Sequence, residues 1–440
     1  MKKFNTVLLL VACLFIHSLA FAQDSLKQHV LTLSEAFRLA IDNSVQLKVT
    51  AKNVDLAHQQ TEVRKLGRLP SMSTGLNYGY ISNADIWTPG FEQHILGLSP
   101  HHLVSFNVVA GQVIFSGNAV KNSILESQFD EQIAELSQKN NETDTKFLVA
   151  QKYLDIYRFI TQKQVFANNL KLANARLRNI LVLQKQGMVT QNDVLRTGIT
   201  ISDLKLSIEE TDNNIAIVNK QLNMLTGRPD SARMIPDSTL LSQSEVDQQL
   251  SYFMEAAYRE NHDLKIANTQ SKKAETDVRL SGSDRLPQLS LFAQTNLDRP
   301  YVFSNPPTDI YLNVWEAGIG VKYNISSIYQ APKRIKESKL KLEQSQVAET
   351  LQKQQLELAV SSAYIKYNEA KDELVTLTND LKSAQENYRI VEKKYYNQLA
   401  LLTDMIDAAN TKIEAEIRVT NGQINVIFCY YQLLRSVGTI

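Results

Sequence analysis

Residues 68–80 read RLPSMSTGLNYGY, and the tripeptide Arg-Leu-Pro that opens this stretch returns at residues 285–287. From Met72 to Tyr80 the even positions are mostly apolar, while the odd positions hold Ser, Gly and Asn. Alternation with a period of two places apolar side chains on one face of a β-strand and polar side chains on the other. The stretch therefore predicts a strand with one apolar face.

The same alternation recurs at residues 104–110 and 315–323, so we expect strand pairs at about residues 70–115 and 287–325. Roughly ten alternating residues is the length that a tilted strand needs to cross the hydrocarbon of a membrane. Aromatic residues gather near the expected strand ends: Tyr80, Trp87, Tyr301, Tyr311 and Trp315. A soluble antiparallel sheet with one face on a core is the alternative. The aromatic belt and the scarcity of long charged side chains on the polar face favour strands in lipid.

The chain contains an internal duplication. Five residue pairs lie 211 positions apart without a gap: Tyr153 and Tyr364, Leu170 and Leu381, Asp193 and Asp404, Leu222 and Leu433, and Gly227 and Gly438. Near the front of each copy the offset is 217, as for Arg68 and Arg285. We expect a first repeat at residues 23–228, a connector at residues 229–249 and a second repeat at residues 250–440.

Long helical segments follow each expected strand pair. No proline or glycine occurs from Asn118 to Gln184, a stretch that spans roughly 100 Å as a helix at ~1.5 Å per residue. We expect helical hairpins at about residues 118–226 and 332–437. In the second helix of each hairpin, steps of three and four residues mark a coiled-coil seam. The seam residues are Ile201, Leu204, Ile208, Thr211, Ile215, Val218, Leu222 and Leu225, then Ile413, Ile417, Thr420, Ile424, Ile427, Tyr431 and Leu434.

Four strands in one chain cannot close a barrel on their own. An open sheet edge inside lipid leaves backbone hydrogen-bonding groups unpaired, at a cost of several kcal/mol each. The expected strands must therefore share a barrel with other copies of the chain. The strand count alone permits two, three or four protomers. Three protomers would give a twelve-stranded barrel, which is wide enough to leave a channel.

The first residues predict export. Two lysines precede an apolar run from Val7 to Leu19, and Ala20-Phe21-Ala22 offers the small residues that a signal peptidase reads. We expect residues 1–22 to be a signal peptide. The preceding Leu10-Val11-Ala12-Cys13 also has the shape of a lipobox, which would make Cys13 a lipidated residue, although apolar residues continue beyond it. No later stretch reaches the 18 apolar residues that suggest a transmembrane helix.

Charge and motifs argue against nucleic-acid binding and catalysis. Without residues 1–22 the chain has 45 basic and 46 acidic residues, whereas nucleic-acid binding favours a basic surplus. Cys429 would then be the only cysteine, which excludes a disulfide framework. No Walker loop, G-x-S-x-G or H-E-x-x-H motif occurs. His101-His102 lies in an expected loop without acidic or cysteine neighbours, so we expect no enzyme activity, no cofactor and no metal site.

Over nearly its whole length after residue 22, the chain resembles the TolC family of outer-membrane channels. The shared features are the duplicated order of two helices, two strands and two long helices, together with the turn at the hairpin tips. Residues 186–195 read QGMVTQNDVL, close to the family turn G-x-x-[ST]-x-x-D-V-L, with Gly187 as helix C-cap and Thr190 as N-cap. At the second tip Gln398 replaces the glycine, while residues 404–408, DMIDA, keep the family pattern D-[VM]-[LI]-D-A.

The resemblance implies roles for individual residues of the tips. Asp404 and Asp407 match positions that line the narrowest part of the pore, and Asp193 and Tyr395 match positions that latch its closed mouth. The usual latch arginine is Ala400 here, so that salt bridge is absent. The tips are expected to dock an adaptor through Gly187, Met188, Val189 and Thr190 of the first tip and Gln398, Leu399 and Ala400 of the second.

The resemblance also implies the fold and the partners. The expected protein is a mixed α/β membrane protein in which three protomers share a twelve-stranded barrel across a Gram-negative outer membrane. A coiled-coil tunnel would continue the barrel through the periplasm, and the assembly would be the exit duct of a tripartite efflux pump or a type I secretion system. The expected partners are a homotrimer, outer-membrane lipid, a periplasmic adaptor and an inner-membrane pump of the RND, ABC or MFS type. A periplasmic coiled-coil adaptor or scaffold is the alternative, against which the duplication and the four strands argue.

Overall fold

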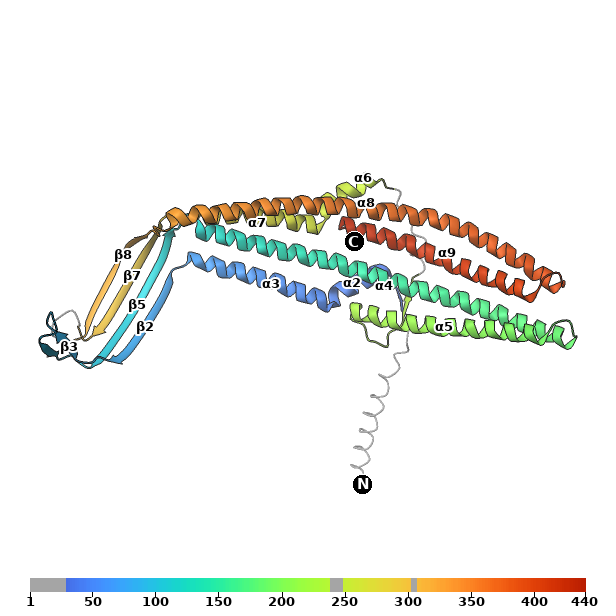
Figure 1. The fold of residues 1–440 in the computed structure, drawn as a ribbon, viewed down its shortest axis with the longest axis horizontal. Coiled ribbons are helices and arrows are strands. Elements are labelled where there is room, and N and C mark those ends of the chain that lie inside the picture. Colours follow the sequence, from blue (N-terminus) through green and yellow to red (C-terminus); the bar gives the residue numbers. More distant parts are fainter. Residues whose placement is uncertain (1–28, 238–247, 302–306) are drawn as a thin grey trace, which may run out of the picture. The chain divides into compact units, whose positions relative to one another are not determined.

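The computed structural model describes residues 29–237, 248–301 and 307–440 (Figure 1). The expected signal peptide and Cys13 lie outside these residues. The chain divides into two compact units, of which we call Thr50–Gln138 with Asp263–Gln354 the sheet unit. The described residues of Met1–Val49, Lys139–His262 and Gln355–Ile440 form the hairpin unit. Within the described ranges, no helix has both the length and the apolarity needed to cross a membrane.

The sheet unit contains a four-stranded antiparallel sheet in the order β2-β5-β7-β8. Its strands are β2 (Ser71–Tyr80), β5 (His102–Phe115), β7 (Gln288–Arg299) and β8 (Leu312–Lys322). A small ribbon of β3 (Ala84–Trp87) and β4 (His94–Gly97) lies in the connection between β2 and β5. Among the described residues, β2 and β8 each have one side without a strand partner, because they are the two edges of the sheet.

The strand register collects apolar side chains on one face of the sheet. One row across the four strands reads Met72, Ala110, Ala293 and Ala317. The neighbouring row, which points to the opposite face because successive residues alternate, reads Ser73, Val109, Gln294 and Glu316. Among the described residues, the large side chains of the apolar face are open to solvent: Met72 is 74% exposed and Trp315 is 76% exposed. The alternation in the sequence therefore produces one solvent-exposed, apolar face of the sheet.

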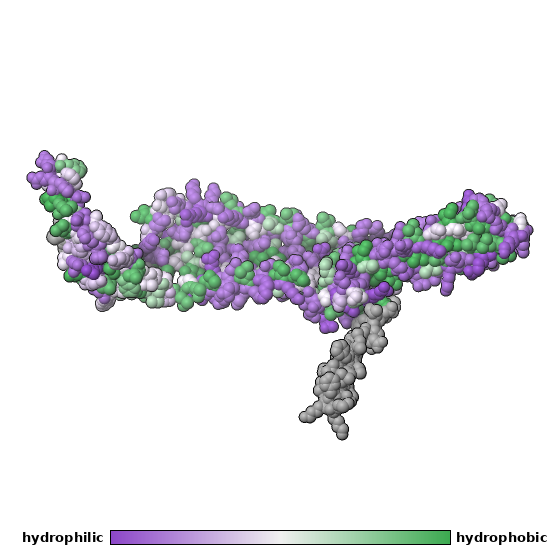
Figure 2. Space-filling model, turned by 90° about the horizontal axis from the view of Figure 1, so that it is seen from below, coloured by the Kyte–Doolittle hydropathy of each residue, from purple (hydrophilic) through white to green (hydrophobic). Residues whose placement is uncertain are grey.

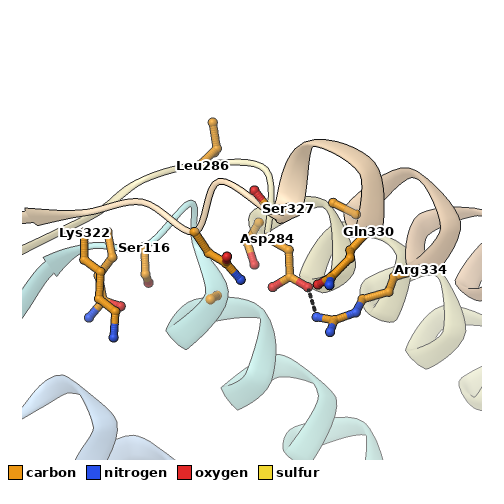
Figure 3. Close-up of a pocket in the computed structure, with 12 residues that line it drawn as sticks. Ser116, Asp284, Leu286, Lys322, Ser327, Gln330 and Arg334 are labelled. Carbon is orange, nitrogen blue, oxygen red and sulfur yellow. Dashed lines mark hydrogen bonds and ion pairs between the residues drawn. The ribbon is translucent and has the colours of Figure 1, made fainter.

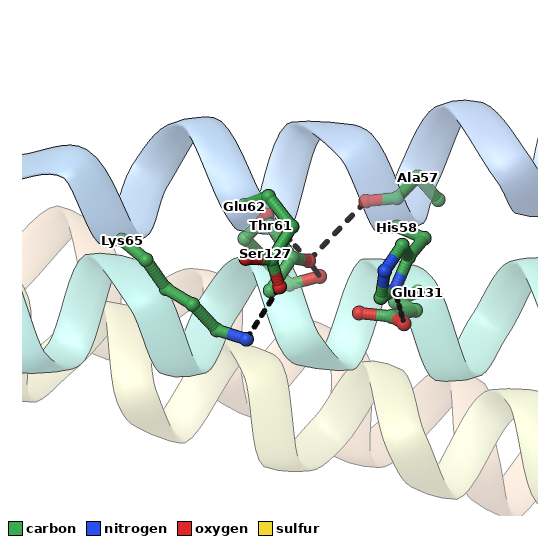
Figure 4. A network of polar contacts seen from close by, with 7 residues as sticks. All are labelled: Ala57, His58, Thr61, Glu62, Lys65, Ser127 and Glu131. Atoms are coloured by element: carbon green, nitrogen blue, oxygen red, sulfur yellow. Dashed lines mark hydrogen bonds and ion pairs between the residues drawn. The ribbon is translucent and has the colours of Figure 1, made fainter.

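Helices form the rest of the sheet unit and are joined by side-chain hydrogen bonds. They are α3 (Val45–Lys65), the 3-10 turn η1 (Leu66–Arg68), α7 (His262–Ser283) and the first parts of α4 (Ala119–Lys185) and α8 (Ser327–Tyr396). Thr61 Oγ1 of α3 lies 3.1 Å from both the carbonyl oxygen and the hydroxyl of Ser127 on α4 (Figure 4). Lys273 Nζ of α7 lies 2.6 Å from Asp130 Oδ1 of α4.

An ion pair on the same helices predicts a pH dependence of stability. His58 Nδ1 lies 2.7 Å from Glu131 Oε1 (Figure 4). The hydrogen bond and the charge of Glu131 raise the pKa of His58 above 6.5, and the bond to His58 lowers the pKa of Glu131 below 4.5. The folding stability that His58 contributes is fully present below its unfolded pKa and is lost as pH rises through its raised folded pKa. The folding stability that Glu131 contributes is present above its unfolded pKa and is lost as pH falls through its lowered folded pKa.

The pair is therefore strongest between about pH 4.5 and 6.5. Raising the pH from 6 to 8.5 is expected to lower the thermal unfolding temperature more for the wild type than for His58→Gln. The difference should be on the order of 1 °C, because the His58 side chain is largely exposed. Thermal unfolding by circular dichroism at both pH values measures this difference. Equal shifts in the two proteins would show that the pair contributes no stability.

The hairpin unit contains two helix hairpins. The first joins the later part of α4 to α5 (Gln191–Thr226), and the second joins the later part of α8 to α9 (Leu402–Val437). In α9, Thr420 and Ile424 of the predicted seam are buried and the rest are half-buried. In α5, five of the eight predicted seam residues are buried: Ile201, Leu204, Thr211, Val218 and Leu222.

A buried tyrosine holds two short strands against α4. The strands β1 (His29–Leu31) and β6 (Met234–Pro236) pair in parallel, and the sequence did not predict them. The Tyr153 hydroxyl donates to Leu31 O at 2.6 Å and accepts from Asp237 N at 2.7 Å. Burial raises the pKa of Tyr153 to about 12, so the hydroxyl stays neutral and serves both bonds.

The remaining elements of the hairpin unit are short. Thr32 caps α2 (Leu33–Asn43), because its hydroxyl accepts from Glu35 N at 3.2 Å. A second short helix, α6 (Leu250–Glu260), follows the expected connector. That connector includes β6, and its residues 238–247 lie outside the described part of the chain.

Candidate functional site at the hairpin tips

The first tip has a defined turn at each helix end. Gly187 has φ +75°, and its N–H donates to Gln184 O at 2.9 Å, while Met188 N–H donates to Leu183 O at 2.9 Å. These two bonds form the Schellman motif, which needs a left-handed residue at the position of Gly187. Thr190 caps α5 in a reciprocal arrangement with Asp193. The caps predicted from the sequence at Gly187 and Thr190 are confirmed.

The second tip has the same turn without the same residues. Gln398 has φ +61°, its N–H donates to Tyr395 O at 2.9 Å, and Leu399 N–H donates to Lys394 O at 2.8 Å. A side chain with a Cβ takes this left-handed conformation at a cost of roughly 1–2 kcal/mol. Leu401, at the N-cap, has no side-chain oxygen, and Asp404 Oδ2 alone accepts from Leu401 N at 3.0 Å. The second tip is therefore the less stably closed of the two turns.

Glycine at the second tip is expected to relieve this strain. The change Gln398→Gly should stabilise the turn by about 0.5–1 kcal/mol, because glycine takes positive φ freely. Gln186→Gly is the matched control, since Gln186 lies one residue before the turn of the first tip and does not have positive φ. Hydrogen exchange of the tip amides measures local opening. Slower exchange should occur only in Gln398→Gly, and faster exchange in that variant would contradict the strain.

The two tips pack on a common apolar cluster. Tyr395 is 7% exposed and packs with Ile180 of α4 and with Leu402 and Met405 of α9. Its buried hydroxyl has no hydrogen-bond partner within the described ranges. Burial raises the pKa of Tyr395, and the nearby charge of Asp193 raises it further. The two predicted latch residues thus lie close together, but Asp193 Oδ2 accepts from the backbone N–H and the hydroxyl of Thr190.

The other predicted site residues lie on the surface of the tips. Asp404 and Asp407 are exposed and three residues apart on α9, so they share one face of that helix. Of the residues expected to dock an adaptor, Val189 and Ala400 are half-buried and the rest are exposed: Gly187, Met188, Thr190, Gln398 and Leu399. The tips therefore present both a pair of carboxylates and apolar side chains to the solvent.

Sequence reasoning missed a buried arginine that joins the two hairpins. Arg176 of α4 is 6% exposed, and its Nη2 donates to the Tyr388 hydroxyl of α8 at 3.2 Å. That hydroxyl donates to Glu392 Oε1 at 2.6 Å, and Lys412 Nζ of α9 lies 5.2 Å from the centre of the Tyr388 ring. Burial, and then the bond to Glu392, raise the pKa of Tyr388. The i, i+4 spacing of Tyr388 and Glu392 was the only signal in the sequence.

The expected loop position of the histidine pair is wrong for His102, which is the first residue of β5, whereas His101 lies directly before that strand. His102 Nδ1 lies 3.0 Å from the Tyr78 hydroxyl, and His101 stacks on Tyr80 with ring centroids 5.0 Å apart. Within the part of the chain that the structure describes, no group of three or more His, Cys, Asp or Glu residues could hold a metal ion. The histidines instead extend the aromatic surface at the end of β2.

Comparison with known proteins identifies what the chain resembles. Residues 254–426 match the family described as outer membrane efflux protein. The chain resembles CusC at 14% identity and TM-score 0.77, over 92% of this chain and 91% of that chain. It resembles VceC of the bacterial pathogen Vibrio cholerae at 10% identity and TM-score 0.74, over 92% and 96% of the two chains.

A third similar structure is the CmeC outer membrane channel of Campylobacter jejuni, at 14% identity and TM-score 0.74. That comparison covers 92% of this chain and 85% of CmeC. At these identities the structures share the fold. No curated protein sequence matches the chain significantly.

Proposed function

We propose that this chain, which matches the outer membrane efflux protein family over residues 254–426, is one protomer of a homotrimeric channel in a Gram-negative outer membrane. Proteins of this family are transport conduits and not enzymes. The trimer would form a twelve-stranded barrel that continues into a helical periplasmic tunnel. It would serve as the passive exit duct of a tripartite efflux pump, with a type I secretion system as the alternative use.

The open edges of the sheet support assembly with further copies. The strand order β2-β5-β7-β8 leaves β2 and β8 unpaired on one side within the described residues. Placing β8 of one copy beside β2 of the next continues the antiparallel order, because neighbouring strands in the sheet alternate in direction. Each such pairing removes two exposed edges, and closure of the ring removes all of them, as hydrocarbon requires.

The observation that carries the proposal is that helices next to both edge strands have uncovered apolar stripes. On α3 and η1 the exposed residues Leu56, Val63 and Leu66 follow heptad steps, and on α8 Leu340, Val347 and Leu351 do the same. Two residues lie between η1 and β2, and four residues lie between β8 and α8. Pairing β8 with β2 of the next copy would therefore place one stripe against the other. On the face seen in the space-filling view, hydrophobic residues lie among hydrophilic ones (Figure 2).

The tips would dock a periplasmic adaptor, and an inner-membrane pump would supply the energy. The exposed Met188 and Leu399 offer apolar contacts for an adaptor hairpin. Asp404 and Asp407 would form carboxylate rings at the pore mouth in the trimer. Asp193 and Tyr395 would act as a latch, for which the buried, unpartnered Tyr395 hydroxyl provides the free donor.

The hydrogen bond of Arg176 to Tyr388 would hold the mouth closed, because Ala400 stands where the family has its latch arginine. The change Arg176→Met removes the bond to Tyr388 while keeping most of the side-chain volume. It is expected to raise the single-channel conductance of the resting protein in planar bilayers by several-fold, since truncating a buried charged hydrogen bond costs about 2–4 kcal/mol. Arg178→Met, at an exposed position two residues on, is the matched control. Identical conductance of the two variants would exclude a gating role for Arg176.

The test of the proposed function is the native mass and membrane attachment of the wild-type protein. A channel is expected to remain in membranes after carbonate washing, and in mild detergent to have three times the protomer mass after correction for bound detergent. A protein that washes off with carbonate and is monomeric at all concentrations would leave the sheet edges open. The proposed channel function would then be wrong, and a periplasmic scaffold or adaptor would be the better description.

A further inference from the structure

The start of α8 carries a surplus of basic residues. Residues 322–341 contain six lysines and arginines and one glutamate. The segment at the same place in the first repeat, residues 111–130, contains one lysine, one glutamate and one aspartate. Both segments run from the end of a strand into a long helix. The charge is therefore not a general requirement of the junction between strand and helix.

Most of these cations have no acidic partner in the chain. Arg334 pairs with Asp284 at 2.9 Å, and Lys341 pairs with Glu337 at 2.7 Å. Lys333, Lys336 and Lys339 are exposed, and within the described ranges no carboxylate lies within ion-pair distance of them. We call these three residues the lysine collar. An unpaired cluster of like charges costs stability unless an external anion neutralises it.

A cavity of about 230 Å³ lies beside the collar, between the end of β8 and the first turns of α8 (Figure 3). Lys322 and Arg334 lie at its two ends, with Asp284 beside Arg334. Ser327 also lines the cavity and is 5% exposed, and its Oγ has no hydrogen-bond partner among the described residues. The first N–H groups of α8 are already bonded to residues 324–326. The positive character of the cavity thus comes from side chains and not from the helix N-terminus.

The collar follows directly on an exposed apolar belt. Ile325, Ile328 and Tyr329 are each more than half exposed and lie between β8 and the lysines. At ~1.5 Å per residue, Lys333 and Lys339 are about 6 and 15 Å from Tyr329 along the helix axis. Side chains on a helix lean toward its N-terminus, here the end next to the sheet, so the ammonium groups reach back toward the belt. The lipid headgroup layer is about 5–8 Å thick on each side of the hydrocarbon.

We infer that the lysine collar docks on anionic phospholipid headgroups of the membrane leaflet that faces the helices, and that the cavity holds one headgroup phosphate between Lys322 and Arg334. This inference rests on the proposed function, because it needs the sheet to lie in the membrane. An apolar belt followed by unpaired cations is the arrangement by which proteins bind an anionic lipid surface. Phosphate oxygens would neutralise the lysines and give the Ser327 hydroxyl an acceptor.

The test measures lipid binding by the full-length protein in mild detergent. Wild type and Lys333→Gln/Lys336→Gln/Lys339→Gln are titrated with phosphatidylglycerol or with phosphatidylcholine, and bound lipid is counted by native mass spectrometry. Phosphatidylglycerol affinity is expected to fall by about tenfold or more in the collar variant, because three cations near the headgroups are removed. Phosphatidylcholine binding should not change. The variant Lys322→Gln is expected to lose the most tightly held phosphatidylglycerol of each protomer.

A matched control separates the collar from net charge. The triple variant Lys171→Gln/Lys205→Gln/Lys382→Gln changes the charge equally at exposed sites of the hairpin unit, and should bind phosphatidylglycerol as the wild type does. If the collar variant binds it equally well, the inference is wrong, whether or not an acidic protein binds the collar instead. Carbonate resistance and native mass are measured on the same preparations. A wild-type monomer that washes off would refute the proposed function, whereas normal trimers with unchanged lipid binding refute the collar alone.

Discussion

The double variant Val347→Lys/Leu351→Lys is expected to run as a monomer in mild detergent, whereas the wild type runs as a trimer. Both side chains are exposed in the single chain and lie one turn apart on the stripe of α8. In the proposed assembly they face the α3 stripe of the next copy. Burying an unpaired ammonium in an apolar seam costs about 2–4 kcal/mol at each interface, which is enough to dissociate the ring.

Native mass and circular dichroism together make this test decisive. The helix signal should be unchanged, because neither residue supports the fold of the protomer. The conservative variant Val347→Ile/Leu351→Met keeps the apolar stripe and should remain trimeric. A lysine variant that is still trimeric would show that the stripe does not lie between copies. The proposed pairing of β8 with β2 would then need another explanation for the exposed heptads.

Neutralising Asp404 and Asp407 together is expected to abolish cation selectivity. Three copies would bring six carboxylates to the pore mouth, where closely spaced charges concentrate cations and exclude anions. The variant Asp404→Asn/Asp407→Asn should lower the cation-to-anion permeability ratio by about tenfold, toward one. Asparagine is chosen because its side-chain oxygen still accepts from Leu401 N–H, so the capping bond of α9 is kept.

Reversal potentials in a salt gradient across a planar bilayer measure this ratio. Glu414→Gln on the same helix is the control, since Glu414 is exposed and lies two turns beyond Asp407. It should keep the selectivity of the wild type. An unchanged ratio in the double asparagine variant would mean that the two carboxylates lie on a solvated face away from the pore.

Periodic features of the fold could be predicted from the sequence, and features that depend on register could not. The alternation around Met72 and Trp315 reports directly which side chains share a face, and the heptad from Ile201 to Leu222 reports a buried stripe. Arg176 and Tyr388 are 212 residues apart in the sequence, and their contact depends on the axial register between α4 and α8. No local pattern encodes that offset.

A turn is also missed from the sequence when its backbone conformation is adopted by a residue that rarely takes it. Glycine at position 187 predicts a left-handed turn, whereas glutamine at position 398 does not. Both residues nevertheless have positive φ and the same pair of hydrogen bonds. The packing of Tyr395 and Leu402 beside the turn supplies the energy that holds Gln398 there. Similarly, β1 and β6 have three residues each, too few for the alternation of a strand to be recognised.

The pairing of β1 with β6 has a consequence for the order in which the chain can fold. His29 pairs with Met234, so the partner of β1 lies 205 residues later, and Tyr153 can complete its two hydrogen bonds only when Asp237 is present. Such a non-local contact forms late, because a long loop must close first. Because β6 lies after residue 228, the predicted end of the first repeat, residues 23–228 alone could not form the pairing of β1 with β6. During synthesis β1 therefore lacks its partner strand until β6 and Asp237 have been made.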